Sequence, residues 1–164
     1  RIKARTHAKA LPVFVRDVAQ ARHYTFVERE LVKILEGMWP GQTTVILRKK
    51  PAMPDAVTGG TKTVGLRVPD HPFILSLLAQ YPHPLTATSA NLSGSEPASS
   101  AADIRKVFSH HVPRPDLLVD GGALPPSPPS TVLDLTNPSN PRILRMGAIT
   151  KEKLGEILSQ WPKR

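Results

Sequence analysis

The stretch from 84 to 94 combines a short predicted strand with a run of small polar residues. It reads Pro-Leu-Thr-Ala-Thr-Ser-Ala-Asn-Leu-Ser-Gly. Small side chains let a ligand approach the backbone, and hydroxyl and amide groups supply short, directed hydrogen bonds. In open α/β sheets, the loops that follow strands commonly bind the ligand. Ser89 and Asn91 are therefore candidate binding residues, although the same composition is also typical of an ordinary turn.

Basic residues at two other places could bind an anion. Lys3 and Arg5 would share one face of an extended segment and could hold a phosphate, but a frayed terminus explains their spacing equally well. Arg67 lies in the middle of the predicted strand 63–68, on the face of Thr63 and Gly65. An arginine buried there needs an anionic partner, because an unpaired buried charge is costly. An arginine on a solvent-exposed face needs none.

Composition limits the classes of protein that the chain can represent. Its 164 residues suit one domain with a core, and the absence of cysteine excludes disulfides, zinc–thiolate sites and cysteine nucleophiles. The net charge of +9 indicates a polyanionic partner or a solvated basic surface. No stripe of alternating aromatic and basic residues is present, so we favour a basic pocket over a long nucleic-acid groove. Without an apolar membrane-spanning run or a signal-peptide pattern, we expect a cytoplasmic protein with no membrane partner.

Predicted strands and helices alternate along the chain, which favours an α/β sandwich. We expect strands at 11–15, 43–48, 63–68, 85–88, 117–119, 130–135 and 142–145, and helices at 25–38, after Asp70, from 100 and at 150–161. A capping box is predicted at 25–28, and residues 49–61 are expected to form a loop. His110 and His111 fit a surface helix end better than a metal site.

Seven segments occur in the order that is typical of the YrdC-like family, and through them the chain resembles the threonylcarbamoyl-AMP synthases of that family. These segments are Lys3-Ala4-Arg5, Pro40-Gly41, Thr63-Val64-Gly65-Leu66-Arg67-Val68-Pro69, Thr88-Ser89-Ala90-Asn91-Leu92-Ser93-Gly94, Asp120-Gly121-Gly122, Ser130-Thr131-Val132 and Arg145-Met146-Gly147-Ala148-Ile149. The resemblance spans nearly the whole chain, and its specificity comes from the combination of segments.

The resemblance implies a single YrdC-like domain over residues 1–164, built as a twisted mixed β-sheet flanked by helices, with a basic concave cavity. It implies a nucleotidyltransferase that joins L-threonine, bicarbonate and ATP into threonylcarbamoyl-AMP and releases pyrophosphate. The product would serve the threonylcarbamoyladenosine modification of tRNA, so tRNA or the downstream transfer machinery is an expected partner. Mg²⁺ is expected to accompany ATP, bound more by its phosphates than by protein carboxylates.

The resemblance also implies roles for individual residues. Lys3 and Arg5 are expected to be catalytic by holding the triphosphate, with Lys9 nearby. Arg67 is expected to pair with the carboxylate of threonine, and Ser130 to contact the same substrate. The other residues expected at the ATP site are Thr63, Ser89, Asn91 and Arg145.

Three departures from the family pattern affect these expectations. Family members have about fifty residues before the position of Lys3, in line with ordinary domain sizes, and that segment includes a Thr-Asp-Thr motif that helps to hold threonine. We therefore expect residues 1–164 to be an N-terminally incomplete domain that binds ATP weakly and forms little product. Phe14 occupies a position where many members have a histidine in the threonine pocket. The loop after Gly94 is one residue longer than usual, so the contact near 97–99 is not placed.

Two alternative functions remain open on the sequence. One is a YrdC-like module that binds RNA through its basic cavity without catalysis. The other is a carbamoyl-transfer domain of the hydrogenase-maturation type, which is normally flanked by zinc-finger and acylphosphatase regions. Threonine-dependent release of pyrophosphate would distinguish the synthase from both.

Overall fold

The computed structural model describes residues 10–123, 125 and 127–159, and these fall into two compact units. The larger, called here the sheet unit, comprises Ala10–Ala87 and Pro128–Arg164. The smaller, called here the small unit, comprises Thr88–Ser127 among the described residues. Each unit is described by itself.

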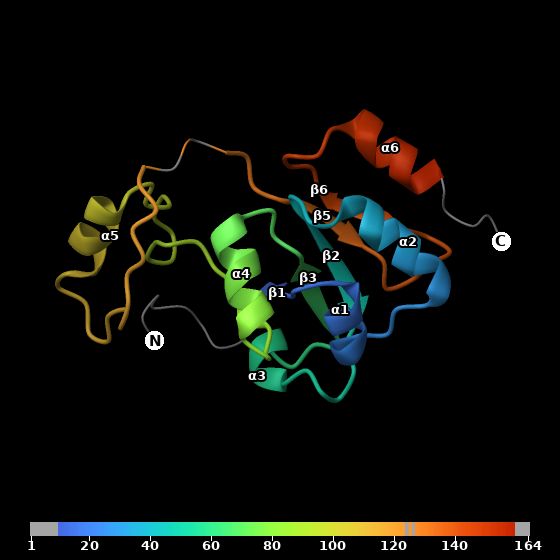
Figure 1. Ribbon diagram of the computed structural model, residues 1–164, viewed down its shortest axis with the longest axis horizontal. Helices are drawn as coiled ribbons and strands as arrows, with labels where there is room; N and C mark the ends of the chain where they lie inside the picture. The colour runs from blue at the N-terminus through green and yellow to red at the C-terminus, as the bar shows by residue number, and fades with distance from the viewer. Residues whose placement is uncertain (1–9, 124, 126, 160–164) are drawn as a thin grey trace. The chain divides into compact units, whose positions relative to one another are not determined.

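A six-stranded mixed sheet forms the centre of the sheet unit, in the order β4-β1-β3-β2-β5-β6 (Figure 1). Two neighbouring pairs, β1 with β3 and β2 with β5, are parallel, and the other three pairs are antiparallel. The strands are β1 (Val13–Phe14), β2 (Thr43–Arg48), β3 (Thr63–Arg67), β4 (Leu85–Thr86), β5 (Thr131–Asp134) and β6 (Arg142–Arg145). The expected mixed α/β sheet is therefore confirmed.

The two faces of this sheet have different compositions because side chains alternate along each strand. In β3, Val64 and Leu66 are fully buried, whereas Thr63, Gly65 and Arg67 are only partly buried, as the alternation in the sequence predicts. The buried face continues into the neighbouring strands through Val45 of β2 and Leu133 of β5, among others. The opposite face carries the polar and charged side chains.

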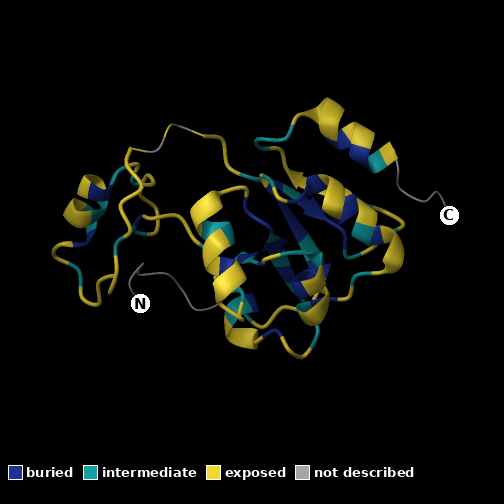
Figure 2. Cartoon of the chain, viewed as in Figure 1, coloured by how far each residue is buried: buried dark blue, intermediate teal, exposed yellow. Residues whose placement is uncertain are grey.

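Two helices pack against the apolar face. α2 (Arg29–Met38) and α6 (Lys151–Ser159) lie side by side and turn their buried residues toward the sheet (Figures 1 and 2). Leu35 and Leu154 are almost fully buried in the same core as Leu66. Burial of one such side chain contributes about 2 kcal/mol of hydrophobic free energy, so this layer stabilises the sheet that carries the polar face.

The predicted capping box at 25–28 is wrong. The chain forms a separate helix, α1 (Val18–Tyr24), whose cap is Asp17, and the Asp17 carboxylate accepts from the Gln20 amide at 2.7 Å. Thr25 ends this helix and donates its hydroxyl to the Ala21 carbonyl, so it is not available to cap α2. α2 begins after Glu28, which caps it without a side-chain hydrogen bond.

Three further expectations differ from the structure. The helix α4 (Pro72–Gln80) is capped by His71 and not by Asp70, because the residue before a proline adopts an extended conformation. The expected loop 49–61 contains a short helix, α3 (Asp55–Thr58). No strand forms at 117–119, where Leu117 and Val119 are 80% and 55% exposed, since the sheet offers that segment no partner strand.

The described part of the small unit contains the loop 88–100 and the helix α5 (Ala101–Phe108). Ser100 caps this helix as predicted, and its hydroxyl accepts from the Asp103 amide at 3.1 Å. Across the described residues, no helix combines the length and the apolar character needed to cross a bilayer.

Candidate functional site

Arg67 lies at the end of β3 on the polar face of the sheet, and its guanidinium is held in one orientation. Its Nε donates to the Gly41 carbonyl at 2.7 Å, and its guanidinium carbon lies 5.8 Å from the centre of the Phe14 ring. Burial lowers the pKa of Arg67 from its usual value, and the charge of Asp70 opposes that change. Among the described residues, no hydrogen bond engages the two terminal nitrogens. A half-buried, oriented cation of this kind suits the binding of a carboxylate.

The turn before β2 positions Gly41 for this contact. The Gly41 amide donates to the Val68 carbonyl at 2.9 Å, and the indole of Trp39 donates to the Thr43 carbonyl at 2.9 Å. A side chain at Gly41 would lie 2.6 Å from the Met38 carbonyl oxygen, so the close turn requires glycine. The sequence segment Pro40-Gly41 therefore acts by holding Arg67.

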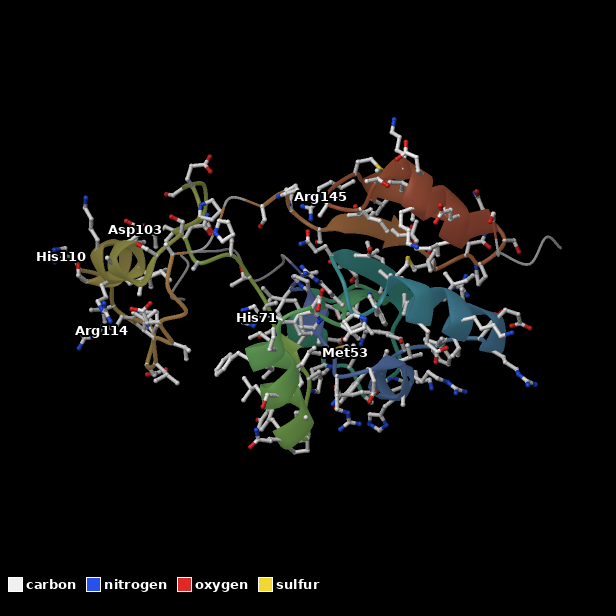
Figure 3. The ribbon with its side chains drawn as sticks, turned by 45° about the horizontal axis from the view of Figure 1, so that its top comes forward. Met53, His71, Asp103, His110, Arg114 and Arg145 are labelled. Atoms are coloured by element: carbon white, nitrogen blue, oxygen red, sulfur yellow. The ribbon has the colours of Figure 1, made fainter. Side chains whose placement is uncertain are left out.

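Ser130 lies just before β5 and contacts side chains from two other strands. Its hydroxyl is 2.9 Å from that of Thr44 in β2, and its carbonyl accepts from Arg145 of β6 at 2.8 and 3.1 Å. Arg145, which Figure 3 labels, also reaches the Ser130 hydroxyl at 3.3 Å. The structure thus brings Ser130, expected to contact threonine, together with Arg145, expected to contact the nucleotide, and adds Thr44 to them.

The backbone on both sides of Ser130 is fixed by the segment that follows β6. The Thr131 hydroxyl accepts from the amides of Gly147 at 3.0 Å and Ile149 at 3.3 Å, and the Ala148 amide donates to the Pro129 carbonyl. The Cα of Gly147 lies so close to this backbone that a Cβ there would be only 2.6 Å from the Thr131 nitrogen. Ser130 consequently belongs to a tightly packed corner, formed by residues 129–131 and 147–149.

Thr63 starts the same strand that Arg67 ends, about 13 Å away along the chain direction. It pairs with Arg48 of β2 and lines a basic hollow together with Lys62. Thr63 is therefore apart from the corner at Ser130. Among the expected nucleotide contacts of the sheet unit, Arg145 therefore lies beside Ser130, whereas Thr63 lies at the other end of β3 from Arg67.

Ser89 and Asn91 belong to the small unit, where the loop folds back on itself. The Ser89 hydroxyl donates to the Asn91 side-chain oxygen at 2.6 Å, and the Asn91 amide nitrogen donates to the Ser95 carbonyl. A backbone bond from Ala98 to Ala90 closes the loop at 3.1 Å. This arrangement fixes a loop of small residues, as the sequence predicts, and leaves the two expected ATP contacts as predictions.

The remaining expected site residues, Lys3, Arg5 and Lys9, lie outside the described residues. Within the described ranges, no group of three His, Asp or Glu side chains is arranged to hold a metal ion. Sequence reasoning missed Thr44 and Gly41 as supporting residues, although Pro40-Gly41 was part of the family pattern. The sequence around Thr44 does not predict its contact with Ser130, because that contact depends on β5 lying beside β2.

The sheet and its polar face define an α/β protein with cationic side chains arranged for anionic ligands. Residues 1–147 match the family model of Sua5, YciO and YrdC, described as "Telomere recombination". The chain belongs to this Sua5/YciO/YrdC family.

Similar proteins agree with this assignment. The chain is 35% identical over 158 residues to a protein of Bacillus subtilis named threonylcarbamoyl-AMP synthase, covering 95% of this chain and 44% of that protein. It superposes on the structure of P. abyssi Sua5 complexed with L-threonine with a TM-score of 0.85 and 29% identity, covering 98% of this chain and 46% of that one. For E. coli YciO, the TM-score is 0.78 at 28% identity, with 93% and 73% coverage. The chain thus spans less than half the length of the first two relatives.

Proposed function

We propose that this chain provides the synthase domain that forms threonylcarbamoyl-AMP for the modification of tRNA. The names of the relatives and the L-threonine in the P. abyssi Sua5 structure support the substrate class. The observation in this chain that supports it most is the half-buried guanidinium of Arg67, which Gly41 holds through Nε while no hydrogen bond among the described residues engages its two terminal nitrogens. The carboxylate of an amino acid can accept a hydrogen bond from each of these two nitrogens.

The chemistry requires no nucleophile from the protein. The amine of threonine attacks the carbon dioxide derived from bicarbonate and loses a proton as the carbamate forms. If bicarbonate itself is attacked, its C–OH bond breaks and the hydroxide leaves with that proton as water. A carbamate oxygen then attacks the α-phosphorus of ATP, and the bond to the bridging oxygen breaks so that pyrophosphate leaves with its electron pair. Such transfers depend mainly on positioning and on neutralising the phosphate charge.

The proposal gives each expected site residue a role. Arg67 and Ser130 hold threonine, with Ser130 kept in place by Thr44 and by the corner at Gly147. Lys3, Arg5 and Lys9 hold the triphosphate, and Mg²⁺ arrives with ATP as part of that substrate. The further nucleotide contacts in the proposal are Thr63, Ser89, Asn91 and Arg145.

The test is threonine-dependent release of pyrophosphate from ATP, with threonine binding measured by calorimetry. Arg67→Met should lose about 2–4 kcal/mol of threonine binding, because a charge-assisted pair to the carboxylate is removed. Arg29→Met removes an equal charge from the exposed start of α2 and should bind threonine like the parent chain. Equal threonine affinity in the parent and Arg67→Met proteins would refute the assignment of Arg67.

A further inference from the structure

The basic hollow that Thr63 lines has a volume of about 540 Å³ and lies in the sheet unit, at the end of β2 and the start of β3. Residues from distant parts of the sequence line it. These are Phe26, Arg48, Lys49, Lys50, Pro51, Lys62, Thr63 and Thr136. The volume falls in the range of ordinary ligand pockets.

Backbone hydrogen bonds join three segments of this lining, which are residues 24–26, 48–50 and 62. The Phe26 amide donates to the Arg48 carbonyl at 2.9 Å, and the Lys50 amide donates to the Tyr24 carbonyl at 2.8 Å. The Lys49 amide donates to the Lys62 carbonyl at 3.0 Å. The hollow is consequently fixed by backbone contacts at the end of two central strands, β2 and β3.

The charges around the hollow favour an anion. Four of the eight lining residues are cationic, and the described lining contains no carboxylate. Lys49 is neutralised by Asp55 at 2.7 Å, but no ion pair among the described residues involves Arg48 or Lys62, and both are exposed. Two cations therefore remain to bind phosphate groups.

An exposed aromatic ring lies among these cations. Phe26 is 58% exposed, and the Lys50 ammonium lies 5.5 Å from its centre while donating to the Arg22 carbonyl. Phe26, Arg48 and Thr136 also line an adjacent hollow of about 470 Å³. The ring and Arg48 are thus shared by two hollows, and the adjacent hollow is also lined by one carboxylate, that of Glu28.

We propose that this basic hollow binds an unpaired segment of a nucleic-acid strand, with a base against Phe26 and phosphates on Arg48 and Lys62. Stacking on an aromatic side chain combined with a cationic track is how proteins hold single strands without reading their sequence. Two hollows that share one ring suit consecutive nucleotides better than one mononucleotide. An acidic peptide would use the cations but would have no need of the ring.

The first experiment measures binding of fluorescein-labelled oligouridine to the 164-residue chain by fluorescence anisotropy. Phe26→Leu keeps apolar packing but removes the ring, and it should weaken binding about tenfold, while Phe26→Tyr should retain it. Phe73 is an exposed aromatic residue of α4, 48% exposed and outside the hollow. Phe73→Leu is therefore the matched control and should bind like the parent chain.

The second experiment varies the salt concentration. Lys62→Ser should weaken oligouridine binding and reduce the slope of log affinity against log salt by about 0.7, the value for one phosphate contact on a single strand. Lys33→Ser removes the same charge from an exposed position of α2 and should leave the slope unchanged. Thermal melts of all variants verify that the fold is retained.

Three outcomes would overturn the proposal. An equal loss in Phe26→Leu and Phe73→Leu, or equal slopes in the two lysine variants, would reduce the binding to diffuse charge attraction. Displacement of oligouridine by poly-aspartate as readily as by unlabelled oligouridine would indicate an acidic polypeptide as the partner. Displacement by ATP at equal phosphate concentration would indicate that the hollow is instead part of the ATP site to which the proposed function assigns Thr63. Pyrophosphate release should be unchanged in Phe26→Leu, so this test and the test of the synthase proposal fail independently.

Discussion

Arg67 and Arg145 both donate Nε to a backbone carbonyl, but they differ in the nitrogens that remain. Arg67 uses Nε alone for Gly41, whereas Arg145 uses both Nε and Nη2 for the Ser130 carbonyl. A ligand of Arg67 can therefore accept hydrogen bonds from both terminal nitrogens of its guanidinium. A ligand of Arg145 meets a guanidinium that is already bound to Ser130, and it must use the remaining nitrogen or compete for the contact.

Thr44 offers a test of how Ser130 is held. Thr44→Val keeps the shape of the side chain but removes the hydroxyl that lies 2.9 Å from Ser130, and it should cost about 1 kcal/mol of stability. The apparent KM for threonine should rise while kcat changes little, because Ser130 helps to bind threonine in the proposal and Thr44 has no contact with a reacting atom in it. Steady-state kinetics with urea unfolding of the same proteins check both parts. A fall in stability with no change in KM would limit Thr44 to a structural role.

The sequence revealed the special position of Arg67 but not the network around Ser130. Alternation within one strand, Thr63 to Arg67, needs only local information, and the structure has that alternation. The contact of Thr44 with Ser130 needs the register of β2 against β5, which are separated by more than eighty residues. The basic hollow at Phe26 was missed for the same reason, because its aromatic and cationic residues meet only in the folded sheet.

At the scale of elements, the corner between β5 and the segment after β6 is the tightest feature near the site. Gly147→Ala should destabilise the fold by about 3 kcal/mol or more, because the new methyl group would overlap the backbone of Pro129 to Thr131. Gly155→Ala in α6 meets no atom within 4 Å and should be stabilising by about 0.5–1 kcal/mol. Chemical unfolding of the pair provides the comparison. Equal stability of the two variants would mean that the corner can relax.

Asp134, at the end of β5, should make the stability of the fold depend on pH. Burial alone would raise the pKa of Asp134, but hydrogen bonds from Arg142 and Thr136 hold it below its usual value of 3.8. A carboxylate with a depressed pKa in the fold contributes stability above its unfolded pKa, near 4, and loses it as the pH falls through the lower folded value. Asp134→Asn should therefore be less stable than the parent at pH 6, and the difference should shrink below pH 4, as thermal melts across this range would reveal. A constant difference would exclude the linkage.

Local patterns predicted the strands more reliably than the helix ends. The strands at 43–48 and 142–145 have the predicted bounds, since their apolar runs end at turn-forming residues and each finds a partner. The helix start at Thr25 failed because a preceding helix uses that threonine as its end. The segment 117–119 is apolar enough for a strand, but apolar composition alone does not supply a neighbouring strand.

At the scale of the whole molecule, the two units have unequal cores. The sheet unit contains nearly all of the buried apolar side chains, whereas Ala101 and Phe108 are the buried apolar residues described in the small unit. Amides of β2 and β3 should therefore exchange with deuterium most slowly, and those of α5 should exchange faster by several orders of magnitude. Hydrogen exchange followed by mass spectrometry checks this. Equal protection of α5 and β3 would show that the small unit is stabilised by more than its own core.

Both outer strands of the sheet have features that oppose pairing with another chain. β4 has only two residues, and the exposed strand β6 begins and ends with arginine around the apolar pair Ile143 and Leu144. Short or charged edges disfavour strand addition, because an incoming strand gains few backbone bonds or must desolvate the charges. Arg142 and Arg145 thus protect the solubility of the protein in addition to their contacts within it. A lineage that lost either arginine would need another barrier against self-association at this edge.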